Sequence, residues 1–225
     1  MKKNLTLIFV FFNIILGNSQ KNYLTQFDDL VKNENLPFHN GKFNFEIYNI
    51  DPSSPSNIYF YSEAKLGSFI YNSQIYQNLN LKYDVFNDQL IYFENSKMNN
   101  GGLILDKTKI NCFYINNLFF QKKNNLGYCQ VLEEKNNVKL LQKHYKIKKE
   151  KNSGKNVTYY FLNREKFYLE INNHLFSINK KKSLIKLFPD FEVEINKFYN
   201  KNEKLFSDNK AQFFIKLIQL IEDEN

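Results

Sequence analysis

Turn signals divide the middle of the chain into short segments, and their spacing constrains the fold more than any other feature of the sequence. Between Asn57 and Ile178 these signals recur every 8 to 20 residues, with no helical pattern between them. Tight turns join antiparallel strands, whereas parallel strands need crossover connections of about a dozen residues or more. The sequence therefore predicts an antiparallel β-meander over residues 57–178, with turns at Asn87-Asp88, Asn99–Gly102, Asn116-Asn117, Asn124-Asn125, Asn136-Asn137, Asn152–Asn156 and Asn172-Asn173.

One segment of this meander shows the two-residue period of a half-buried strand. Apolar and polar residues alternate there, which places one set of side chains in a core and the other in solvent. Hydrophobic residues make up 43% of the whole chain, too large a share for a disordered protein. In this segment we expect the buried residues to be Ile75, Leu79, Leu81, Tyr83 and Val85.

Residues 20–56 are predicted to place a helix, a hairpin and a loop in front of the meander. Apolar residues from Tyr23 to Val31 recur at helical spacing and predict a short amphipathic helix. Asn40-Gly41, between two apolar segments, is a strong signal for a two-residue hairpin turn. Two prolines within Asp51–Ser56 exclude a central strand and indicate a turn or surface loop.

The pattern changes near Lys182, and residues 183–225 are predicted to be helical. A first helical turn should stop at Pro189. The segment Asp190–Asn200 fits either a strand or a helix, and its helical neighbours favour the helix. Asp208 is expected to cap a last helix, whose apolar stripe is Phe214, Leu217, Ile218 and Ile221.

Together these segments predict one α+β domain over residues 20–225. We expect an antiparallel β-meander, forming a curved sheet or a partial barrel. A short N-terminal helix precedes it, and the C-terminal helices pack on it. A chain of this length can bury a moderate core as a single domain.

The two cysteines are predicted to remain unpaired. A two-residue turn at Asn116-Asn117 places Cys112 opposite Gln121, and a loop over 124–126 places Gln121 opposite Cys129. The cysteines then lie on one face of the sheet, two strand spacings or roughly 10 Å apart. A disulfide needs Cα atoms within about 7 Å of each other, so this register excludes one.

The first 19 residues have the three parts of a secretory signal peptide. Lys2 and Lys3 are followed by an apolar run from Leu5 to Leu16, and small residues then precede a predicted cut after Ser19. A membrane anchor is the alternative, but the run is shorter than the about 20 apolar residues that a span needs. We therefore expect an exported protein, periplasmic or secreted, with no transmembrane span after cleavage.

The segment from Gly67 to Ser96 resembles the opening of a group of short exported Bacteroidetes proteins of unknown function. A Gly-Ser-aromatic start leads through a strand to Lys82, Tyr83 and Asp84, where the group has a basic-Tyr-Asx stretch, usually with Arg first. The similarity extends to about Glu222. It implies export, a β-rich fold and terminal helices, and it implies no catalytic residue.

Residue types that carry out catalysis are scattered. His39, His144 and His174 lie far apart, with no second ligand at metal-binding spacing. Asp28-Asp29 and Glu133-Glu134 are adjacent carboxylates on single elements, which suits solvated charge better than acid–base catalysis. The chain contains neither a Gly-x-Ser-x-Gly elbow nor a Gly-rich phosphate loop. We therefore predict no enzyme activity, no metal and no cofactor.

The strongest candidate for a binding site is a run of lysines. The chain carries a net charge of +8, almost all of it from Lys, since Arg164 is its one arginine. This composition and the expected export argue against nucleic acid as a partner. Anionic lipid or another polyanion is the partner that the run would suit, and a solvated edge strand is the alternative reading. The residues concerned are Lys143, Lys146, Lys148, Lys149 and Lys151.

These features predict an exported, non-catalytic protein of the envelope or the medium that binds a protein or an envelope component. The alternative is a carrier that encloses an apolar, lipid-like ligand within a curved sheet rich in Phe and Tyr.

Overall fold

The computed structural model describes residues 37–45, 47–54, 56–94, 101–135, 138–153 and 156–223. The predicted signal peptide and the predicted helix near Tyr23 lie outside these residues. The chain divides into two units, residues 1–42 and 43–225. In the first unit, Pro37–Asn40 form the 3-10 helix η2. The predicted hairpin around Asn40-Gly41 is therefore wrong, because Pro37 fixes a φ angle that suits the first turn of a helix.

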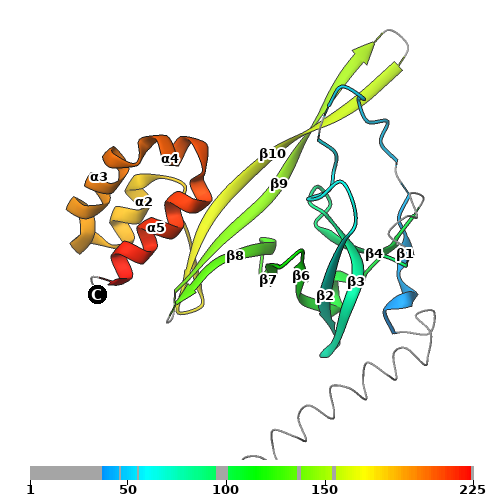
Figure 1. Ribbon diagram of the computed structural model, residues 1–225, viewed down its shortest axis with the longest axis horizontal. Helices are drawn as coiled ribbons and strands as arrows, with labels where there is room; N and C mark the ends of the chain where they lie inside the picture. The colour runs from blue at the N-terminus through cyan, green and yellow to red at the C-terminus, as the bar shows by residue number, and fades with distance from the viewer. Residues whose placement is uncertain are drawn as a thin grey trace, which may run out of the picture. The chain divides into compact units, whose positions relative to one another are not determined.

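The second unit is built on an open antiparallel sheet of eleven strands (Figure 1). Their order is β1-β5-β4-β3-β2-β6-β7-β8-β9-β10-β11, so β6 returns to pair with β2 and the meander changes direction there. The strands are β1 Lys42–Phe43, β2 Lys65–Tyr71, β3 Gln74–Asp84, β4 Gln89–Phe93, β5 Leu103–Ile104, β6 Ile110–Ile115, β7 Leu118–Lys123, β8 Gly127–Lys135, β9 Val138–Ser153, β10 Asn156–Ile171 and β11 His174–Ser177.

The Asn-rich turns lie where the sequence places them. Asp88, Asn116, Asn117, Asn125 and both residues of the 172–173 turn have positive φ angles, between 48° and 64°. Asn and Asp tolerate this left-handed conformation better than most residues, and hairpin turns require it. The turn at 72–73 was not predicted, and positions 99–100, 136–137 and 154–155 lie outside the described residues.

The predicted alternation along β3 is right at one end and wrong at the other. Leu81, Tyr83 and Val85 are buried, but Ile75 is 55% exposed and its neighbour Tyr76 is buried instead. The register with β2 shifts between these two ends, and Asn78 adopts a φ of 57° there. Such a bulge adds one residue to the strand, so every side chain before it changes face.

Aromatic rings fill the core between β3 and the β6–β8 strands. Phe113 and Phe120 stack at 4.8 Å, and Tyr83 lies 5.3 Å from each of them. Tyr128 meets the edge of Phe113 at 5.0 Å, and Phe60 meets Phe120 at 5.4 Å. These rings therefore contact one another.

Strands β7–β10 curl toward the face that is opposite the aromatic core. Lys123 of β7 and Glu170 of β10 form an ion pair of 2.6 Å, and only about a tenth of either side chain is exposed. In a flat sheet, three strand spacings would separate these positions by roughly 14 Å. A register shift between Val131 and Glu133 bends β8 and contributes to the curl. The predicted antiparallel sheet is confirmed, and it does not close into a barrel.

The cysteine prediction is confirmed in every pairing. Cys112 faces Gln121, which faces Cys129 on its other side, and both thiols are free. Cys129 is fully buried in the curled face, where burial raises the pKa of its thiol to about 11.

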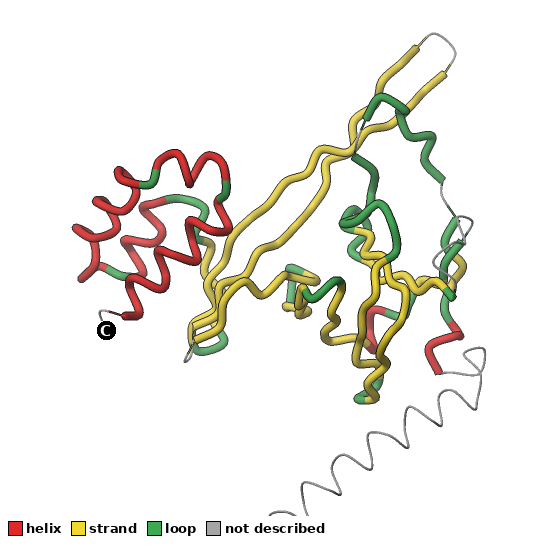
Figure 2. Tube along the Cα trace, viewed as in Figure 1, coloured by secondary structure: helices red, strands yellow, loops and turns green. Residues whose placement is uncertain are grey.

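Helices occupy the C-terminal end, as predicted, and gather beside one end of β8–β10 (Figure 2). Asp190–Asn200 is helical apart from its first residues, which form a 3-10 turn. The expected Asp208 cap is off by one residue, since Asn209 Oδ1 accepts the hydrogen bond from Gln212 N. The helices are α2 Lys181–Leu187, η4 Pro189–Phe191, α3 Glu192–Lys201, α4 Glu203–Asp208 and α5 Lys210–Asp223.

Helix α5 covers the sheet with the predicted stripe. Leu140 of β9 and Phe167 and Leu169 of β10 share a core with it, and Phe167 lies 4.8 Å from Phe214. The α5 side chains in this core are Phe213, Phe214, Leu217, Ile218 and Ile221, all at most 2% exposed.

Candidate functional site

The β9–β10 hairpin continues beyond the rest of the sheet. β8 pairs with β9 only as far as Gln142, and β11 pairs with β10 only from Tyr168 onward. Residues 143–153 and 156–166 therefore form a two-stranded ribbon, which we call the arm (Figure 1). Residues 49–51 join its β10 edge at one point, where Ile50 forms a bridge with Tyr159. The predicted lysine run lies on this arm, and β10 is its one ladder partner among the described strands.

The arm has two faces because side chains alternate along each strand and directly paired residues share a face. The face that carries His144, Lys146, Lys148, Phe161 and Asn163 contacts residues 48–60 and the β3–β4 turn, and we call it the covered face. The opposite side is called the open face, and its side chains are those of Lys143, at the base, and of Tyr145, Ile147, Lys149, Lys151, Thr158, Tyr160, Leu162, Arg164 and Lys166.

Apolar packing anchors the covered face. Phe161 is 1% exposed and lies 5.3 Å from Tyr48 and 5.2 Å from Phe86. Lys148 places its ammonium 4.8 Å from the ring of Tyr159 and 5.6 Å from that of Tyr48. A cation over an aromatic face is attracted by the ring quadrupole, so Lys148 contributes to this packing.

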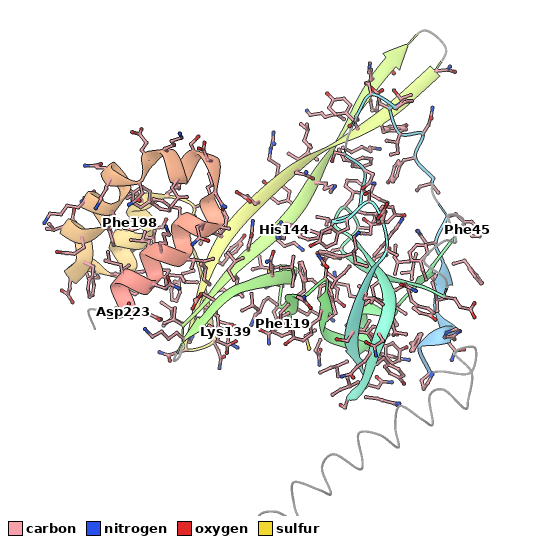
Figure 3. All side chains as sticks on the ribbon, viewed as in Figure 1. Phe45, Phe119, Lys139, His144, Phe198 and Asp223 are labelled. Atoms are coloured by element: carbon pink, nitrogen blue, oxygen red, sulfur yellow. The ribbon has the colours of Figure 1, made fainter. Side chains whose placement is uncertain are left out.

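Two titratable groups on the covered face have shifted pKa values. Burial lowers the pKa of His144, which is labelled in Figure 3, to about 4, and its ring lies 4.8 Å from that of Phe60. Burial also lowers the pKa of Lys146 to about 8. Both line a cavity of about 150 Å³ with Asn163 and Arg164. Shifted groups in a cavity are the usual mark of a catalytic site.

Each of these groups is, however, bonded to a fixed protein partner. His144 Nε2 lies 2.8 Å from Gln130 Oε1, and the Lys146 ammonium donates to the Asn57 carbonyl. Nearby, the buried Asp84 carboxylate accepts from the backbone and side-chain nitrogens of Asn87 at 2.9 and 2.8 Å. The Lys146 bond holds Asn57 against the arm, the His144 contact joins the arm to β8, and the Asp84 bonds close the β3–β4 turn, so all three groups have structural roles.

A charged cluster joins the base of the arm to the β3–β4 turn. The Asp88 carboxylate accepts from Tyr83 Oη at 2.5 Å, from Lys143 Nζ at 2.8 Å and from Lys107 Nζ. Burial acts to raise the pKa of Asp88, but the charge of Lys143 and these hydrogen bonds outweigh it, and the pKa lies below its ordinary value.

Gly127 makes room for this cluster. Its φ is +74°, and a Cβ atom there would lie 1.8 Å from Asp88 Oδ2. No other residue fits at this position.

The five lysines of the predicted site are thus not one surface. Lys143 is paired with Asp88, and Lys151 with Asp51 at 2.8 Å. Lys146 and Lys148 belong to the covered face. Lys149 alone points from the open face into solvent with no hydrogen bond or ion pair to the described part of the chain.

The open face combines residues that sequence reasoning did not bring together. Ile147 pairs with Leu162, and the two flanking pairs are Tyr145 with Arg164 and Lys149 with Tyr160. Lys166 reaches over the Tyr145 ring at 5.4 Å. The hairpin register that sets these pairs follows from the pairing of Ser153 with Asn156. The predicted turn at 152–156 could have revealed these pairs, because a hairpin built on that turn sets which residues of the two strands face each other.

Charge on the open face has one sign. The arm's two described carboxylates, Glu150 and Glu165, belong to the covered face. Among the described residues, Asp51 and Asp88 lie beside the open face, and each is bound to a lysine, Asp51 to Lys151 and Asp88 to Lys143. An apolar centre of Ile147 and Leu162, flanked by two tyrosines, is therefore surrounded by cations.

An open groove of about 610 Å³ lies beside the arm, between β10 and the 51–56 loop. Its lining mixes Ser53, Ser54, Glu150 and Lys151 with Tyr160 and Leu162. The loop is held by Asp51, whose Oδ1 accepts from Ser53 N at 3.0 Å and from Ser53 Oγ at 2.8 Å.

The remaining predicted residues are dispersed. His39 lies in η2, and His174 is exposed at the start of β11, next to the Asn172 carbonyl. Glu134 forms an ion pair with Lys139 at 2.8 Å. Within the described ranges, no three His, Cys, Asp or Glu side chains are grouped so as to hold a metal ion.

Across those same ranges, none of the helices has the length and apolar character that crossing a bilayer requires. Comparison of this chain with protein-family models, with curated proteins and with solved structures finds no match.

Proposed function

We propose that this chain is an exported, non-catalytic binding protein of the cell envelope or the medium, and that the open face of the arm is its binding surface. One observation carries the proposal: the arm presents apolar side chains surrounded by cations on one side, while its other side is anchored in the fold. An exposed apolar group with a polar rim is typical of an interaction site.

Export is the part of the proposal that rests on sequence. The basic, apolar and small-residue segments before Gln20 support it, as does the resemblance of Gly67–Ser96 to exported Bacteroidetes proteins. N-terminal sequencing of the chain from the exported fraction should begin at Gln20 or a neighbour. Intact Met1 in that fraction would contradict export.

A non-catalytic role is supported by the state of the shifted groups. His144, Lys146 and Asp84 each have a fixed hydrogen-bond partner, and none is bonded to another of the three. A general acid or base must reach the proton that it transfers in a bound substrate. The contacts of these groups are instead directed into the protein.

A carrier of an apolar ligand is supported less well. Such carriers enclose most of the ligand in a cavity lined mainly by apolar side chains. Here Phe113, Phe120, Tyr83 and Tyr128 are in ring contact with one another, so these aromatic residues fill a core. The groove beside the arm is open and carries hydroxyl and charged groups.

Site-specific photo-crosslinking in native envelopes tests the binding surface. A photoreactive residue at Ile147, 38% exposed on the open face, should capture a specific component. The matched control is Val193, which is 57% exposed on α3. Equal labelling from both positions, or none from Ile147, would contradict the proposed surface.

A further inference from the structure

We infer that the partner of the open face is an anionic bilayer surface, against which the arm lies flat. The inference rests on the proposed function and names the partner of the same surface. It differs from the lysine run seen in the sequence, because the contacting cations come from both strands and, of the unpaired ones, Lys149 belongs to that run whereas Arg164 and Lys166 do not.

The side-chain arrangement suits a lipid interface. Ile147 and Leu162 are directly paired at the centre and can insert among the upper parts of the acyl chains. Tyr145 and Tyr160 flank them, and tyrosine rings favour the level of the headgroups. Lys149, Arg164 and Lys166 have long stems that let their charges extend to phosphates while the stems cover apolar surface.

Charge complementarity favours an anionic surface. Lys149, Arg164 and Lys166 point from one face, and the arm's described carboxylates, Glu150 and Glu165, point from the other. Lys151 contributes less than these three because Asp51 neutralises it. Each cation near an anionic membrane adds a favourable term that falls off within a Debye length.

A bilayer is favoured over an acidic protein by the shape of the face. Protein partners obtain most of their binding energy from side chains that fill pockets. The smaller cavity at the arm lies mainly on the covered face, and the groove beside the 51–56 loop, which Tyr160 and Leu162 help to line, is open and carries hydroxyl and charged groups. The open face is instead a ribbon of alternating pairs, whose long side chains match a laterally fluid surface.

The arm is also fixed before it binds. Phe161, Lys148 and Lys146 hold its covered face, and Asp88 holds its base through Lys143. Little conformational entropy is then lost on binding, apart from that of the long cationic side chains.

Co-sedimentation with vesicles tests the inference on the purified, naturally processed chain. We expect binding to phosphatidylcholine vesicles that contain phosphatidylglycerol, and little binding to phosphatidylcholine alone. Raising the salt from low to physiological concentration should weaken it. The double variant Lys149→Gln/Arg164→Gln should lower the partition coefficient roughly thirtyfold, and Ile147→Ser roughly tenfold.

The matched control is Lys197→Gln/Lys201→Gln, which removes the same charge from the exposed side of α3. It should leave the partition coefficient nearly unchanged. Equal losses from both double variants would mean that net charge alone drives adsorption, and would overturn the inference. Each variant is first compared with the parent by its unfolding midpoint, so that misfolding is not read as lost binding.

Failure of this inference and failure of the proposed function give different results. Vesicle binding that is absent, or indifferent to phosphatidylglycerol, overturns the lipid partner. If the photoreactive group at Ile147 still captures a polypeptide in native envelopes, the open face remains a binding surface and its partner is an acidic protein. If neither experiment gives a signal, both proposals fail.

Discussion

Near the helices, Leu140, Phe167 and Leu169 of the β9–β10 hairpin are at most 1% exposed and lie under α5. The arm of the same hairpin adds ion pairs and buried titratable groups to the apolar contacts of Phe161. The register runs unbroken through both halves. Apolar burial depends little on ionic conditions, but ion pairs and buried titratable groups depend on pH and charge. The two halves should therefore respond differently to the same kind of perturbation.

The largest effect is expected where the two halves meet. Asp88→Asn removes the carboxylate that pairs with Lys107 and Lys143 and leaves both ammonium groups partly buried without a counter-charge. Breaking a buried ion pair from one side costs about 3 to 5 kcal/mol of unfolding free energy. Denaturant unfolding measures this loss. Asp208→Asn, an exposed carboxylate on α4, is the control and should change little.

The second-largest effect compares how deeply the helical end and the arm of the hairpin each bury a leucine side chain. Leu140→Ala opens a cavity under α5 and should cost about 3 kcal/mol. Leu162→Ala removes the same atoms from the half-buried open face of the arm and should cost about 1 kcal/mol or less. Similar losses in the two variants would show that the arm is packed as tightly as the helical end, against the proposed open face.

Much of this fold could be predicted because its turns are local. Asn116 and Asn117 adopt the left-handed conformation that a two-residue hairpin needs, and the register of the two cysteines followed from that turn. The errors have non-local causes. The bulge at Asn78 depends on how β3 pairs with β2, and the residue pattern of β3 alone does not mark its position. The return of β6 to β2 depends likewise on tertiary packing.

The site was harder to predict because its parts are distant in sequence. Lys143 was visible as one of a lysine run, but its partner Asp88 was visible only as a turn residue. Tyr145 and Arg164 become neighbours only through the hairpin register. The sequence shows a run of charged residues along β9, whereas the open face is formed by side chains from both β9 and β10.

A pH dependence is expected in the arm. Burial lowers the pKa of His144 to about 4, against an ordinary value of about 6.5. As the pH falls from 6.5 toward 4, the unfolded chain binds this proton before the folded one, so stability is lost over that window. The loss from His144 should be about 2 kcal/mol by about pH 5.

The variant His144→Gln should abolish this contribution, because Gln does not titrate. The control His174→Gln, at an exposed position of β11, should keep it. Unfolding curves at several pH values compare the two. Identical pH profiles for His144→Gln and the parent would contradict the assignment.

The smallest expected effect distinguishes two lysines of the open face, Lys151, which has an ion-pair partner, and Lys149, which has none among the described residues. Lys151 binds Asp51, and this bond, followed by those from Ser53, lowers the pKa of Asp51 to about 2. Lys151→Gln should leave global stability almost unchanged, since half of its side chain is exposed, yet it should speed hydrogen exchange at the Ser53 amide.

Lys149→Gln, two residues away and without such a pair, should leave that amide unchanged but weaken vesicle binding more than Lys151→Gln does. The reason is that Asp51 already neutralises Lys151, whereas the charge of Lys149 is available to a partner. Equal effects of the two variants on both measurements would show that the ion pair with Asp51 does not set which cations of the open face bind.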